Sequence, residues 1–117
     1  MRKWFQLAAL IGILAPIELV SAHAVVTAYS LKSVPIHAHQ ADKVELIFNS
    51  KIELGLSQVY LVRKGDKHAL LKVERGHKQG EVIVYIPALE PGEYAIKFKV
   101  FAADGHLTED IIHFSVS

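Results

Sequence analysis

Short segments in which apolar and polar residues alternate recur along this chain, and they limit it to a fold built from strands. The clearest are 42–49 and 92–101, where apolar side chains fall on every second residue. Alternate residues of a strand point to opposite faces, so each segment offers one face to a core and the other to water. No stretch after residue 22 has the periodicity of a helix.

These segments predict an all-β fold, a single Ig-like Greek-key β-sandwich or barrel of about seven strands separated by turns. Tyr94 follows the turn at Pro91 and Gly92, as in the tyrosine corner of such sandwiches, so we expect its phenol to be structural. We expect strands at 23–31, 42–49, 57–63, 67–74, 81–87, 92–101 and 106–116.

The first 22 residues are typical of an export signal. A positively charged start is followed by an apolar run, which Pro16 and Glu18 interrupt. The run is therefore too short and broken for a confident membrane span, and small residues precede position 23 as at a cleavage site. We expect cleavage after Ala22, with cleavage after Ala24 or an uncleaved anchor as the alternatives.

This division gives a signal peptide at 1–22 and one small domain at 23–117, and it predicts a periplasmic location. The leader holds Arg2, Lys3 and Glu18, so the domain carries 11 basic and 11 acidic residues. A neutral domain has no basic field for nucleic acid, and we expect a monomer. The chain has no cysteine, and its one methionine is Met1. Any metal site in the domain would therefore use nitrogen and oxygen ligands.

Three residues form the candidate site: His23, Asp104 and His106. Asp104 and His106 are two residues apart, so in an extended strand their side chains would share a face. Cleavage after Ala22 would make His23 the first residue, whose α-amine and ring could chelate one metal ion. Three nitrogens and one oxygen suit Cu(II), and we expect one ion per chain. The alternative is that Asp104-Gly105 is an ordinary turn.

Five motifs, in this order and spacing, resemble the CopC family of periplasmic copper-resistance proteins. They are His-Ala at 23–24, Ser-x-Pro at 33–35, V-x-L-x-F at 44–48, L-x-P-G-x-Y at 89–94 and A-D-G-H at 103–106. The resemblance implies a small β-sandwich that binds Cu(II) through His23, Asp104 and His106. It also implies delivery to an inner-membrane copper transporter. The methionine-rich Cu(I) loop of some members has no counterpart here.

The function expected from these features is a copper buffer or carrier that is not an enzyme and has no small-molecule substrate. Two alternatives stay open. The first is a small copper-dependent oxidative enzyme resembling lytic polysaccharide monooxygenases, and the second is a metal-free interaction module. His37 and His39 form an H-x-H pair that is either a solvated loop or a second metal site or helper beside the copper. We expect His68, His77 and His113 at the surface.

Overall fold

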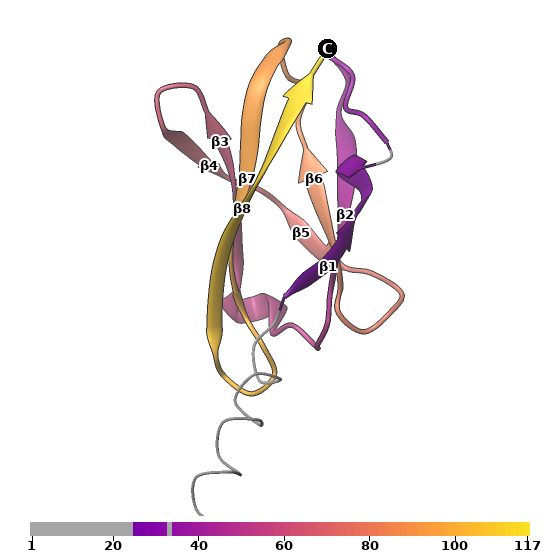
Figure 1. Ribbon diagram of the computed structural model, residues 1–117, viewed down its shortest axis with the longest axis vertical. Helices are drawn as coiled ribbons and strands as arrows, with labels where there is room; N and C mark the ends of the chain where they lie inside the picture. Colours follow the sequence, from indigo (N-terminus) through magenta and orange to yellow (C-terminus); the bar gives the residue numbers. More distant parts are fainter. Residues whose placement is uncertain (1–24, 33) are drawn as a thin grey trace, which may run out of the picture.

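The structure is a computed structural model, and it describes residues 25–32 and 34–117. These residues form two antiparallel sheets of four strands each. One sheet has the strand order β1-β2-β6-β5 and the other β4-β3-β7-β8 (Figure 1). The strands are β1 (Val26–Tyr29), β2 (Asp42–Phe48), β3 (Gln58–Arg63), β4 (Lys67–Leu70), β5 (Val73–Arg75), β6 (Glu81–Ile86), β7 (Gly92–Phe101) and β8 (Leu107–Val116), with two 3-10 turns, η1 (Ser30–Lys32) and η2 (Leu54–Leu56). The predicted all-β sandwich is confirmed, with eight strands among the described residues rather than about seven.

The core lies between the two sheets and is built from the alternating apolar positions. Val44, Leu46 and Phe48 of β2 are at most 3% exposed. Phe48 meets Phe98 of β7 edge to face, with ring centroids 5.4 Å apart. Edge-to-face packing is a favoured arrangement of aromatic rings, so this pair joins the sheets at the centre of the sandwich.

The segment 67–74, predicted as one strand, is two strands in different sheets. β4 pairs with β3, whereas β5 pairs with β6. The chain changes sheets at Leu71, which is 8% exposed and donates its amide hydrogen to the Val59 carbonyl at 2.8 Å. Burial of Leu71 between the sheets ends β4, and one continuous strand could not serve both sheets.

The first strand is also shorter than predicted. β1 covers Val26–Tyr29 and gives way to η1, and its pairing with β2 shifts register between Val26 and Ala28. Residues 1–24, with the expected signal peptide, cleavage site and His23, lie outside the described residues. Within the part of the chain that is described, no helix has the length and apolar character needed to cross a membrane.

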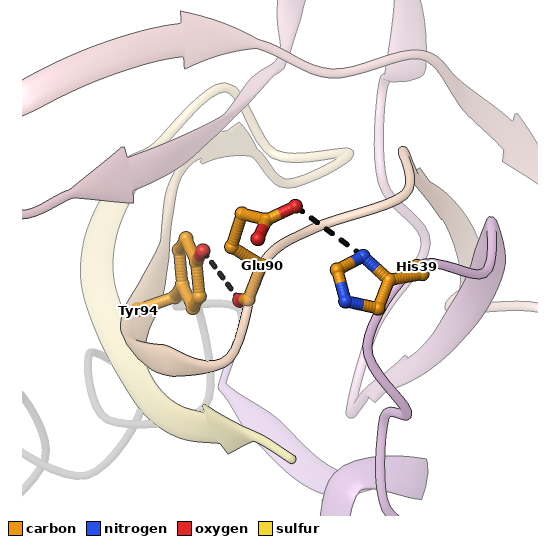
Figure 2. A network of polar contacts seen from close by, with 3 residues as sticks. All are labelled: His39, Glu90 and Tyr94. Atoms are coloured by element: carbon orange, nitrogen blue, oxygen red, sulfur yellow. Dashed lines mark hydrogen bonds and ion pairs between the residues drawn. The ribbon is translucent and has the colours of Figure 1, made fainter.

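The tyrosine corner is present at the start of β7. Tyr94 donates its hydroxyl hydrogen to the Glu90 carbonyl at 2.7 Å, across the turn that leads into the strand (Figure 2). The Tyr94 ring also stacks on Phe114 of β8, with centroids 5.8 Å apart. The phenol is therefore structural, as predicted, and its ring also packs on the neighbouring strand.

Replacing Tyr94 by phenylalanine should remove this hydrogen bond and keep the stacking on Phe114. We expect a loss of about 1 kcal/mol in the free energy of unfolding, or a fall of about 4–8 °C in Tm. Tyr60→Phe is the matched control, since its hydroxyl bonds only to an exposed side chain, Gln58, at 2.7 Å. Equal melting temperatures for the two variants would contradict a special role for the corner.

Candidate metal centre

Asp104 and His106 lie in the turn between β7 and β8, so of the two arrangements considered for this pair, an extended strand and an Asp-Gly turn, the turn is present. The turn is closed by two backbone hydrogen bonds, from Gly105 to the Ala102 carbonyl at 2.9 Å and from Ala102 to the His106 carbonyl at 3.0 Å. Gly105 has φ 90°, a conformation that glycine adopts far more readily than other residues. The two side chains are therefore brought together by the tight turn, and not by the alternation of side chains along a strand.

The two side chains of the D-x-H pair are in direct contact. Asp104 Oδ2 lies 2.9 Å from His106 Nδ1, and Asp104 Oδ1 accepts the His106 backbone amide at 3.0 Å. The His106 side chain is 53% exposed and that of Asp104 is 35% exposed. The predicted convergence of carboxylate and imidazole is therefore present, at a surface that solvent and ions can reach.

The separation of these donors is compatible with either a hydrogen bond or a shared ion. Two ligands at adjacent corners of a square, each about 2.0 Å from a metal, lie about 2.8 Å apart. The 2.9 Å between Oδ2 and Nδ1 is close to that value.

The chain segment that enters β1 is fixed at this same end of the sandwich. Val25 exchanges two hydrogen bonds with Asn49, one to the Asn49 side chain at 2.9 Å and one from the Asn49 amide at 3.0 Å. Two residues further on, the Lys51 carbonyl accepts the Ala103 amide at 3.0 Å. Val25 and Ala103 are therefore both hydrogen-bonded to the short segment 49–51, which places the entry to β1 and the turn at the same end of the sandwich.

Sequence reasoning missed Asn49 and Lys51 as residues that organise this end. An Asn after a strand carries no specific signal, and Lys51 acts through its backbone carbonyl, which any residue would supply. Among residues 25–32 and 34–117, no group of three or more His, Asp or Glu side chains is arranged to hold a metal. His23, the third residue of the predicted set, lies outside the described residues.

His39 lies at the opposite end of the sandwich, near the start of β7. Its amide donates to the Leu89 carbonyl at 2.8 Å, and its Nδ1 is 3.3 Å from Glu90 Oε2 (Figure 2). The ten residues of β7 separate this end from the D-x-H turn, a distance of about 30 Å. His39 and the nearby exposed His37 therefore lie far from Asp104 and His106, which argues against a helper role beside that pair. A second metal site at the H-x-H pair and a solvated loop stay open as alternatives. His68, His77 and His113 are exposed as predicted.

Solved structures with this fold include CopC and PcoC. CopC from Methylosinus trichosporium OB3b is 26% identical, with a TM-score of 0.66, and the match covers 81% of this chain and 94% of that one. PcoC from Escherichia coli, a methionine-rich copper resistance protein, is 21% identical, with a TM-score of 0.61, and the match covers 82% and 100%. This chain differs from PcoC in having a single methionine, Met1.

A superoxide reductase (neelaredoxin) from Ignicoccus hospitalis is 14% identical, with a TM-score of 0.55, and covers 86% of each chain. At this identity the likeness extends to the fold alone. No curated protein sequence matches the chain. The family model of the CopC domain matches residues 29–117, from the last residue of β1 through β8. The chain therefore belongs to the CopC family.

Proposed function

We propose that this protein is a periplasmic Cu(II) carrier or buffer that acts in copper resistance or homeostasis. Copper is its cargo, one ion per chain, and no bond is made or broken in a substrate. Family membership and the likeness to CopC and PcoC support a role in copper resistance. The Cu(II) state, the site residues and the periplasmic location are the parts that the proposal adds.

The proposed ligands are the α-amine and ring of His23, the ring of His106 and the Asp104 carboxylate. One observation carries this set: Val25 is hydrogen-bonded to Asn49, two residues before Lys51, whose carbonyl accepts the amide of Ala103 beside the D-x-H turn. His23 is two residues before Val25, and two residues span at most about 7 Å. A chain that begins at His23 would therefore start within reach of Asp104 and His106.

The donor chemistry supports Cu(II) rather than Cu(I). Imidazole, amine and carboxylate donors suit the tetragonal preference of Cu(II), whereas Cu(I) prefers thiolate and thioether donors. The chain has no cysteine, and its one methionine is in the leader. The amine and the ring must be deprotonated to bind, so acid would promote release. The exposed position of the turn suits exchange of the ion with a partner, for which we propose an inner-membrane copper transporter.

A competitive Cu(II) titration of protein exported and processed by a bacterial host tests this function, with the intact mass read from the same sample. We expect tight binding of one Cu(II) per chain by a protein that starts at His23. Weak binding by that same chain would contradict the carrier function and leave Asp104-Gly105-His106 as an ordinary turn. A mass that places the first residue elsewhere would contradict the amine chelate.

A further inference from the structure

A basic pocket opens at the same end of the sandwich as the D-x-H turn. It encloses about 350 Å³ between the segment 51–54 and the loop that joins β5 to β6. Figure 1 shows that loop and the β7–β8 turn at the same end of the molecule. Three cationic side chains line the pocket, those of Lys51, Arg75 and Lys78. Among the described residues that line it, Glu81 is the one acidic side chain.

The Glu81 carboxylate is hydrogen-bonded to the backbone of the loop that joins β5 to β6. Its Oε1 accepts the amides of His77 at 2.9 Å and Lys78 at 3.1 Å. Its side chain lies so close over Gly76 that a Cβ there would be 2.3 Å from Glu81 Cγ. The carboxylate thus fixes the loop by hydrogen bonds to its backbone, and the three cations around it outnumber its single charge.

Arg75 is also held in place before any ligand arrives. Its Nη1 donates to the Ile52 carbonyl at 3.1 Å, which anchors the guanidinium on the opposite wall of the pocket. A fixed guanidinium loses less conformational freedom when it pairs with a carboxylate than a mobile one does. The pocket is therefore preorganised for an anionic group.

The wall of this pocket is bonded directly to the turn that holds Asp104. The Lys51 carbonyl accepts the Ala103 amide at 3.0 Å, and Ile52 pairs with Ala102 in an antiparallel bridge. A molecule in the pocket would thus lie beside the D-x-H turn. The domain at 23–117 has equal numbers of basic and acidic residues, so this positive charge is local.

We propose that the pocket docks an acidic segment of the protein that exchanges copper with this chain. The inference rests on the proposed function, because it takes the D-x-H turn as the place of exchange. Carboxylates of the partner would pair with Lys51, Arg75 and Lys78, and a bidentate pair with Arg75 would fix the orientation. Complementary charge raises the rate of encounter and sets the register between two proteins.

The test is an NMR titration of the ¹⁵N-labelled, processed protein without copper, with a capped hexaglutamate peptide as the probe. The titration is done at low salt, because salt screens pairs between exposed charges. We expect amide shifts concentrated at 51–52 and 75–81. Lys51→Gln/Arg75→Gln/Lys78→Gln should weaken peptide binding about eightfold, since each exposed pair contributes about twofold. Lys51→Gln/Lys78→Gln keeps the Arg75 anchor, which protects the fold, and should weaken binding about fourfold.

Arg63→Gln/Lys64→Gln/Lys67→Gln is the matched control, with the same change of charge around another surface pocket, beside Gly92 at the start of β7. It should weaken peptide binding less than Lys51→Gln/Arg75→Gln/Lys78→Gln does, because Arg75 is anchored before the peptide arrives. Shifts spread over the surface, or equal weakening in both triple variants, would overturn the docking pocket. Copper titrations of the same samples keep the two proposals apart: a parent that fails to bind Cu(II) contradicts the proposed function, whereas the peptide result reports on the pocket alone.

Discussion

His106→Ala should weaken Cu(II) binding by at least on the order of 100-fold. The substitution removes a proposed imidazole ligand. Loss of a group that only orients a ligand already lowers metal affinity about 10–100-fold. The fold should be unaffected, because the side chain is 53% exposed. The hydrogen bond from the backbone amide of residue 106 to Asp104 Oδ1 needs no side chain, so the turn should also persist in the variant. The measurement is a competitive Cu(II) titration beside thermal unfolding.

The chain contains its own control for this experiment. Asp66 and His68 form a second D-x-H pair, with Asp66 Oδ1 2.8 Å from His68 Nε2. His68 lies in β4 opposite Val62 of β3, and Val62 is in turn opposite Ala95 of β7. Ala95 is near the start of β7, far from the end of that strand that leads to Asp104. His68→Ala should leave Cu(II) affinity unchanged. If His106→Ala and His68→Ala bind copper equally well, the proposed site is wrong.

The strands were predictable because side-chain alternation is a local property. The bounds of β7 agree with the predicted 92–101. The crossing at Leu71 was not predictable in the same way, because it depends on which strands pair and not on the segment itself. Two apolar neighbours, Leu70 and Leu71, differ in burial: Leu70 is 64% exposed on the edge strand β4, and Leu71 is buried in the core.

The candidate site was predictable only in part. The spacing of Asp104 and His106 is local, and their side chains do meet, although through a turn rather than along a strand. The contacts that organise the surroundings join distant segments. Val25 and Asn49 are 24 positions apart, and Lys51 reaches Ala103 through a backbone carbonyl. Such contacts leave no pattern in the sequence, because their geometry arises only when the sheets assemble.

The second large effect is expected from a single residue added before His23. Glutamine is the residue of choice, because at a chain terminus it cyclises to pyroglutamate and leaves no basic amine. The extension would remove one arm of the chelate while every side chain of the domain stays in place. We expect Cu(II) affinity to fall by at least on the order of 100-fold, since two donors on one residue act at a high effective concentration.

The control is a single residue added after Ser117, at the other end of the chain. The last residue is bonded to Ala38 at 2.9 Å, and the C-terminus lies at the end of the sandwich remote from the β7–β8 turn (Figure 1). That addition should leave affinity and the copper absorption spectrum unchanged. An unchanged spectrum and affinity in the N-terminally extended protein would instead show that the amine is no ligand. The metal would then be held by side chains alone, and the position of the cleavage site would lose its importance for function.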